Sequence, residues 1–378
     1  MQFRTEHAEG FGFVCRTDML EALDYDIDSI KTDEDVEGLL AAVKEKYPDV
    51  YPLVSDNGQM NYYMGHKDDL GGDFGVLVDC IEENYTVENW YESDEFYKLA
   101  ERRYNWAQAG YIMPDAETNT QNAYDLIGAG KAFGYYGNTK PGIESEWARK
   151  AGVDMTMIEI ASPYRTSSTG MNCWFIAHNS EQPDKAMMVL NEMRCNPEVS
   201  ELVINGIEGE HYVKKGDVLT YPEGVDASNT TYSSAGWVWP NEFISTPWEA
   251  DGPDIWKDTE EFNDIALMSV AFGFNWNSED VMTEITACSN VKAKYENALF
   301  CGALDPATTI PKFVEELKDA GVDDIIAEKQ RQLDSLNYIY EVEKLLFNAH
   351  EMRDNIDLAL EKIGYITSAQ KVSLWSTN

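Results

Sequence analysis

Apolar residues recur at helical spacing in separate stretches of the chain, and each stretch has a recognisable start or stop. A capping box at Thr32 and Asp35 opens the first stretch, whose apolar positions continue at i, i+3, i+4 and i+7 until Pro48. The same spacing, with acidic residues in the first turn, predicts a second helix over residues 93–110 and a third over 183–194. These three segments are therefore expected to be amphipathic helices that pack on a core.

Short apolar runs rich in aromatic and β-branched residues lie between the predicted helices, and they predict buried strands. These runs cover residues 51–54, 75–79, 131–136, 153–160 and 172–177, and a hairpin is predicted over 211–221. Residues 137–141 and 162–171 are expected to be loops. Helix and strand thus alternate through the first half of the chain, which indicates the α/β class.

The second half of the chain has a different pattern. Residues 222–256 are rich in Gly, Pro, Ser and Trp and have no steady period, which predicts a long ordered loop or a domain connection. Beyond Pro253 the chain is expected to be helical, with one helix ending at Gly321 and long helices over 322–363. We favour a packed terminal element for these last helices over a partner-binding coil.

Composition excludes several classes of protein. The 378 residues include 68 acidic and 29 basic side chains, a net charge of −39, so nucleic acid and anionic membrane surfaces would be repelled. A hydrophobic content of 43% is typical of a folded protein. The first residues lack the basic and apolar regions of a signal peptide, so the chain as written is expected to carry neither a secretion signal nor an anchor.

Metal and cofactor chemistry has no visible motif. The six cysteines lack the short spacing of a zinc or redox pair, and buried free thiols are favoured over disulfides. The five histidines are scattered, so neither a metal site nor a cofactor is expected. There is no Gly-x-Ser-x-Gly elbow, and a carboxylate pair for glycoside hydrolysis cannot be picked from 68 acidic residues without geometry.

Aromatic rings beside planar polar groups are the most informative chemical pattern. They occur at Tyr135, Tyr136 and Asn138, at Tyr164 and Arg165, at Asn172 and Trp174, and at Trp237, Trp239, Asn241 and Glu242. Rings can cover the C–H faces of a pyranose, while amides, carboxylates and guanidinium groups hydrogen-bond its hydroxyls. The pattern favours a carbohydrate site, although each ring alone could equally fill a core.

Several segments resemble the extracellular solute-binding proteins of bacterial ABC sugar importers, in the subgroup of LplA-like lipoproteins with a DUF3502-type C-terminal region. The similar segments are 13–20 (FVCRTDML), 183–186 (PDKA), 205–213 (NGIEGEHYV), 271–274 (AFGF), 287–291 (ACSNV) and 327–330 (AEKQ). The resemblance covers about residues 10 to 336. Members of the family open with a lipoprotein signal and further residues of the first lobe, so the resemblance implies a chain truncated at its N-terminus.

The resemblance implies the type II periplasmic-binding-protein fold, two α/β lobes joined by hinge strands, with a helical C-terminal region. Residues 15–171 would form the second lobe, and residues 1–14 and 172–250 would form the hinge strands and the return segment of the first lobe. Residues 251–378 would form the helical region, DUF3502-like to about residue 336 and then an unassigned tail.

The resemblance also implies a function. The expected protein is not an enzyme but a monomeric extracytoplasmic receptor, a cell-surface lipoprotein in its full-length form, that passes a sugar or oligosaccharide to an ABC permease. Its ligand-binding residues would be Tyr136, Asn138, Arg165, Asn172, Trp174, Glu208, Trp237 and Trp239. The alternatives are a glycan-adhesion module, a non-functional remnant of a binding protein, or a glycoside hydrolase.

Overall fold

The computed structural model describes residues 6–72, 74–77, 84–167, 174–226, 229–232, 234 and 236–347, with side chains to residue 339. Its centre is a five-stranded mixed sheet in the order β2-β5-β1-β6-β9. These strands are β1 (Glu9–Arg16), β2 (Tyr51–Leu53), β5 (Ala132–Thr139), β6 (Met155–Arg165) and β9 (Leu267–Met268). Two small antiparallel pairs accompany the sheet, β3 (Val76–Leu77) with β4 (Val87–Glu88), and β7 (Val213–Lys215) with β8 (Val218–Thr220).

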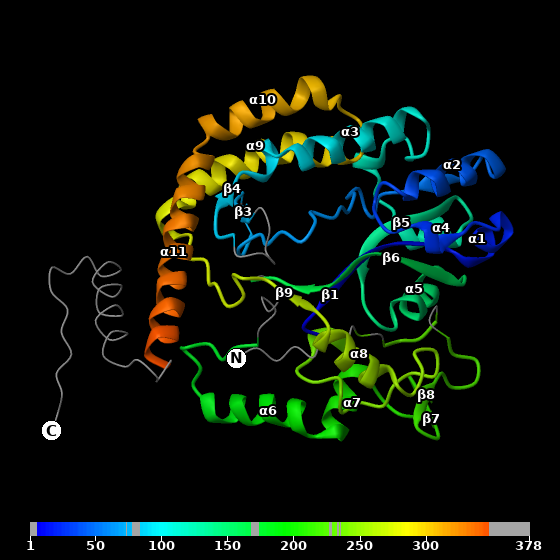
Figure 1. Cartoon of the computed structure of the whole chain (residues 1–378). Coiled ribbons are helices and arrows are strands. Elements are labelled where there is room, and N and C mark those ends of the chain that lie inside the picture. Colours follow the sequence, from blue (N-terminus) through cyan, green and yellow to red (C-terminus); the bar gives the residue numbers. More distant parts are fainter. Residues whose placement is uncertain are drawn as a thin grey trace, which may run out of the picture.

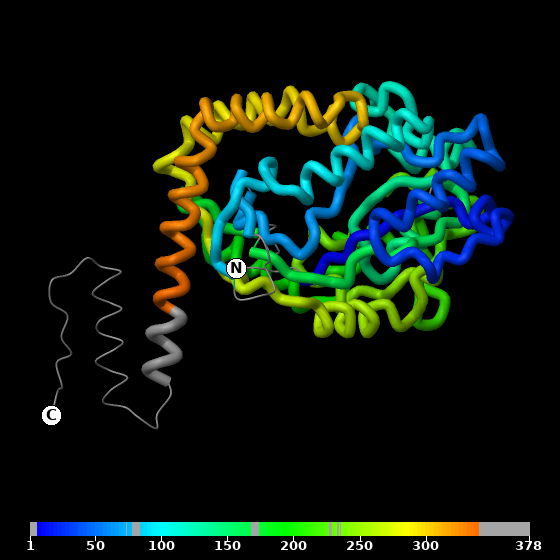
Figure 2. The backbone as a smooth tube through the Cα atoms, turned by 45° about the horizontal axis from the view of Figure 1, so that its top comes forward, coloured from blue at the N-terminus to red at the C-terminus, as the bar shows by residue number. Residues whose placement is uncertain are grey.

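Helices surround the sheet in three groups (Figure 1). The first group is α1 (Thr17–Leu23), α2 (Val36–Lys46), α4 (Ala123–Gly128) and α5 (Ile143–Ala151). The second is α3 (Asp94–Gln108), α9 (Met282–Phe300), α10 (Pro306–Asp319) and α11 (Val322–Phe347). The third is α6 (Pro183–Cys195), α7 (Pro197–Asn205) and α8 (Ile255–Asp264). Figure 2 shows the third group on the opposite side of the sheet from α9 and α10.

The central strand β1 is antiparallel to both of its neighbours in the sheet. Phe13 pairs with Tyr136 of β5 on one side and with Ile158 of β6 on the other. Its side chain is fully buried, in a hydrophobic cluster that also contains residues of α3, α9 and α10. The helices of the C-terminal region therefore share one core with the sheet.

Most of the predicted helices and strands are present. Two strands are longer than predicted, because their last residues pair with neighbouring strands. β5 runs to Thr139 because its residues 137–139 pair with β1, and β6 runs to Arg165 because its end pairs with β1 and β9. The predicted strand over 172–177 is wrong for residues 174–177, which have no regular structure, and its first two residues lie outside the described residues. The helical prediction beyond Pro253 missed β9.

At Gly134, β5 packs against β1 with no room for a side chain. A Cβ atom there would lie 2.5 Å from the Val14 carbonyl oxygen and 2.6 Å from the Phe13 ring. We expect Gly134→Ala to lower the free energy of unfolding by about 1–3 kcal/mol, because the strands must move apart. Urea denaturation measures this, with Asn138→Ala on the exposed end of the same strand as the control; equal effects would contradict the argument.

Candidate functional site

The parallel strands place their carboxyl ends along one edge of the sheet. β2 is parallel to β5, β6 is parallel to β9, and β1 is antiparallel to both β5 and β6. The strands β2, β5, β6 and β9 therefore end at the same edge, which is where β1 enters. We call this the carboxyl edge; open α/β sheets bind ligands just outside such an edge.

A cavity of about 610 Å³ opens beside the carboxyl edge, between α5 and the segment that contains α7 and α8. The turn Lys140-Pro141-Gly142, directly after β5, forms one wall. Six aromatic side chains line the cavity: Tyr124, Tyr221, Tyr232, Trp237, Trp248 and Trp256. Seven ionisable side chains line it as well: Glu6, Lys140, Glu146, Arg149, Lys150, Glu242 and Asp251. Rings and hydrogen-bonding groups therefore meet in one hollow.

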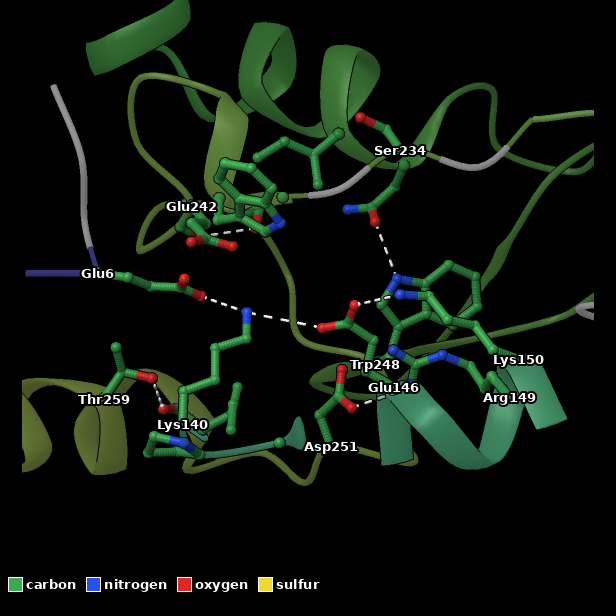
Figure 3. Close-up of a pocket in the computed structure, with 18 of the residues that line it drawn as sticks. Glu6, Lys140, Glu146, Arg149, Lys150, Ser234, Glu242, Trp248, Asp251 and Thr259 are labelled. Carbon is green, nitrogen blue, oxygen red and sulfur yellow. Dashed lines mark hydrogen bonds and ion pairs between the residues drawn. The ribbon is translucent and has the colours of Figure 1, made fainter. Parts of the chain in front are cut away.

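Lys140 is the centre of the polar network in this cavity (Figure 3). Its Nζ atom lies 2.5 Å from Glu6 Oε1, which precedes β1, and 3.7 Å from Glu146 Oε2 on α5. Burial lowers the pKa of the Lys140 ammonium group, but the carboxylates of Glu6, Glu242 and Glu146 outweigh burial and raise it. Lys140 is thus held in its charged form and ties the entry of β1 to the end of β5.

The remaining cations of the cavity are also paired with its carboxylates. Arg149 Nη1 lies 2.9 Å from Asp251 Oδ1, and Lys150 Nζ lies 2.7 Å from Glu146 Oε1. Burial raises the pKa of Glu146, yet Lys140, Lys150 and Arg149 together lower it below its usual value. The cavity therefore holds three cations against four carboxylates, and each cation already has an anionic neighbour.

Two of the tryptophans that line the cavity have polar partners that fix their rings. Trp248 Nε1 donates to Asn205 Oδ1 at 2.9 Å, and the centroid of the Trp248 ring lies 4.7 Å from that of Tyr221. Trp256 Nε1 donates to the Ser245 carbonyl oxygen at 2.8 Å. The aromatic walls are consequently held in place before any solute enters.

Three of the sequence-predicted ligand residues lie in or beside the cavity. Trp237 lines it directly. Trp239 lies next to the cavity. Its Nε1 atom donates to Oγ of Ser234, a residue that lines the cavity, at 2.5 Å. Trp174 stacks on Trp239 with ring centroids 5.6 Å apart and an interplanar angle of 28°. The structure thus brings together Trp174 with two rings that are more than sixty residues away in sequence.

The other predicted residues are spread along the carboxyl edge or beyond it. Asn138 is exposed near the end of β5, and Arg165, at the end of β6, donates from Nη2 to the Asn263 carbonyl oxygen. Glu208 is exposed in the turn after α7. Asn172 lies outside the described residues.

Tyr136 occupies a different position from the one that the sequence interpretation gave it. Its side chain is 1% exposed, stacks on Phe11 with centroids 5.6 Å apart, and lies under the Arg103 guanidinium group. The ring therefore packs in the core beneath the sheet and does not line the cavity. Successive residues of a strand point to opposite faces of the sheet, and other elements cover both faces of β5 at residues 135 and 136. The sequence interpretation placed Tyr136 at the ligand because it did not account for this cover.

Sequence reasoning missed the charged wall formed by Glu6, Lys140, Glu146 and Asp251. The four residues are brought together only by the antiparallel pairing of β1 with β5 and by the return of the chain after α7. The Pro141-Gly142 turn directly after a strand was the one available signal for Lys140. The tryptophan-rich segment 222–256 was noted, but its position beside α5 could not be read from spacing.

Comparisons with known proteins agree with this geometry. Residues 270–337 match a family described as a domain of unknown function, DUF3502. The chain is 26% identical over 347 residues to a carbohydrate ABC transporter substrate-binding protein of Streptococcus pneumoniae serotype 4, covering 86% of this chain and 67% of that protein. The chain is thus similar in sequence, over most of its length, to a solute-binding protein of an ABC transporter.

Solved structures confirm the expected solute-binding-protein fold. One is the N-glycan transport solute-binding protein NgtS from Streptococcus pneumoniae, with a TM-score of 0.76, 25% identity, and coverage of 87% of this chain and 73% of that one. Another is the same protein in complex with Man1GlcNAc, with a TM-score of 0.75, 25% identity, and coverage of 88% and 75%. The homologues are thus solute-binding proteins rather than enzymes.

Proposed function

We propose that this protein binds an oligosaccharide outside the cytoplasm and presents it to the membrane subunits of an ABC importer. The observation that carries the proposal is the cavity at the carboxyl edge, where six aromatic rings and seven ionisable side chains converge. Such a lining suits a pyranose, which offers apolar faces to rings and hydroxyls to polar groups. The relative described as a carbohydrate transport protein supports the same ligand class.

The charge of the cavity favours an uncharged glycan. Each of its three cations already contacts a carboxylate of the same cavity, so a sugar acid would have to displace an existing ion pair. The net charge of −39 further repels anionic solutes. Neutral hydroxyls can instead accept from the ammonium groups and donate to the carboxylates without breaking these pairs.

Within this proposal, the predicted residues other than Tyr136 keep a role in solute contact. Trp237 contributes a ring inside the cavity, Trp174 and Trp239 extend the aromatic surface beside it, and Asn138 and Arg165 supply polar groups at the carboxyl edge. Asn172 and Glu208 are proposed on the sequence pattern alone. The receptor is proposed to act as a monomer and to be a surface lipoprotein in its full-length form.

No helix in the part of the chain that the structure describes combines the length and the apolar character needed to span a bilayer. We propose that permease subunits carry out the transport step, with this chain as the receptor. Closure of the receptor would require a solute that binds the closed state better than the open one.

A thermal-shift screen tests the proposal. Mannose- and N-acetylglucosamine-containing neutral glycans should raise the Tm, because a ligand that binds only the folded state stabilises it by about 2.7 kcal/mol at 100 times Kd. Uronate-containing glycans should give no shift. A cooperative melt that no glycan shifts would contradict the proposal and favour an adhesion module or a remnant, and release of reducing ends would indicate a hydrolase.

A further inference from the structure

The segment 58–77 links β2 to β3 along the carboxyl edge and has almost no regular structure of its own. Over its described residues the only strand is β3, which has two residues. Its backbone donors and acceptors therefore need partners from elsewhere in the molecule. Those partners come to a large extent from α9 and α11, two helices of the region that matches the domain of unknown function.

Helix α9 binds the start of this segment through consecutive residues. Asn297 Nδ2 donates to the Gly58 carbonyl oxygen at 2.7 Å. Glu296 Oε1 accepts from the Tyr62 hydroxyl group at 3.2 Å, and the Tyr62 ring stacks on Phe300 with centroids 3.8 Å apart. One face of α9 thus fixes both the backbone and a side chain of the segment.

Helix α11 binds the end of the segment through Lys329, whose side chain is fully buried. Its Nζ atom donates to the carbonyl oxygens of Asp69 at 2.9 Å and Gly75 at 3.3 Å, and also to that of Gly72. The same atom lies 5.3 Å from the centroid of the Trp276 ring. Burying an ammonium group is costly unless its donors are satisfied, so the position of Lys329 and the path of the segment determine each other.

The turn that faces Lys329 has an unusual backbone. Leu70, Gly71 and Gly72 have φ angles of +55°, +84° and +89° in succession. A leucine rarely adopts a positive φ, and such a conformation persists only where its surroundings enforce it. The three carbonyl contacts of Lys329, together with the burial of the Leu70 side chain, supply that enforcement.

The opposite side of the segment faces the end of β6. The ring centroids of Tyr63 and His66 lie 6.0 Å and 6.1 Å from that of Tyr164. Asp68 Oδ2 accepts from the Ser167 backbone N–H at 2.7 Å. The segment therefore carries a half-buried aromatic group at the carboxyl edge, and its other side is held by α9 and α11.

We propose that the region of unknown function acts as the support of segment 58–77, and that Lys329 is the positioning residue that sets where Tyr63 and His66 lie for solute contact. Lys329 acts through the carbonyl groups of Asp69, Gly72 and Gly75 and does not touch the solute. The support function stands on the structure alone, whereas the solute contact rests on the proposed function.

Hydrogen exchange on the full chain tests the support without any ligand. In Lys329→Met, the amides of Leu70, Gly72 and Leu77 should exchange at least about tenfold faster, while amides of β5 keep their rates. Lys312→Met, at an exposed lysine of α10, should change none of them. Unchanged exchange in the segment, or an equal increase in β5, would overturn the proposal.

A second arm measures the affinity of Man1GlcNAc by calorimetry. Lys329→Met should raise the Kd at least about tenfold, whereas the control Lys312→Met should leave the Kd unchanged. An unaltered Kd in Lys329→Met would overturn the assignment of Lys329 as a positioning residue. If Lys329→Met does not fold, Lys329→Arg, which keeps the charge but not the geometry, should show the same local exchange pattern. Faster local exchange with no glycan binding by the parent chain would contradict the proposed function and leave the support intact.

Discussion

Asp33→Ala should lower the free energy of unfolding by about 3–5 kcal/mol, because it leaves a buried cation without its carboxylate. Asp33 Oδ1 lies 3.0 Å from Nη2 of Arg103, whose side chain is fully buried. The guanidinium group lies 4.4 Å from the centroid of the Tyr136 ring and 4.8 Å from that of Trp106. Because the Arg103 side chain is fully buried against these rings, solvent can compensate only poorly for the lost carboxylate.

Urea denaturation, followed by circular dichroism and tryptophan fluorescence, measures the loss. Glu34→Ala is the matched control, since Glu34 is the next residue, is 78% exposed and lies 3.7 Å from Arg102. Its effect should stay within about 0.5 kcal/mol. Similar losses for the two variants would show that the pair between Asp33 and Arg103 does not stabilise the fold.

The same pair shows how far the sequence could predict the fold. Helix α3 was predicted correctly because its signals are local: the Ser93 side chain accepts from the Phe96 backbone N–H, and apolar residues follow at helical spacing. The core position of Arg103 is, in contrast, not predicted by this periodicity, which places charged residues on the polar face of an amphipathic helix. A buried arginine depends on a carboxylate seventy residues away, and periodicity carries no information about such a partner.

The candidate site follows the same rule. The segment rich in tryptophan was identified from composition, and Trp237 does line the cavity. Lys140 and Glu6, in contrast, are 134 residues apart and meet only because β1 pairs antiparallel with β5. The support of segment 58–77 by Lys329 joins positions more than 250 residues apart. Local chemistry was thus readable, whereas the convergence of distant residues required the topology.

Trp237→Ala should weaken glycan binding by about 2–4 kcal/mol, because a ring in the wall of a cavity loses both stacking and water exclusion when it is truncated. Trp237 is half-buried and lines the cavity beside Ser234 and Glu242. The rings of Trp248 and Trp256 are held by their own hydrogen bonds, so the remaining wall should keep its shape. The Tm of the unliganded variant should therefore fall by only a few degrees.

Calorimetric titration with the neutral glycan that gives the largest thermal shift measures the loss. Trp237→Phe keeps an aromatic face and should retain most of the affinity. If binding depended on the indole itself, Trp237→Phe and Trp237→Ala would lose equal affinity, which would contradict stacking as the source of the effect. Trp174→Ala separates the two aromatic surfaces, because Trp174 is 36% exposed and stacks on Trp239 outside the cavity. A larger loss from Trp174→Ala than from Trp237→Ala would place the sugar on that outer pair, and the cavity would then not be the principal binding surface.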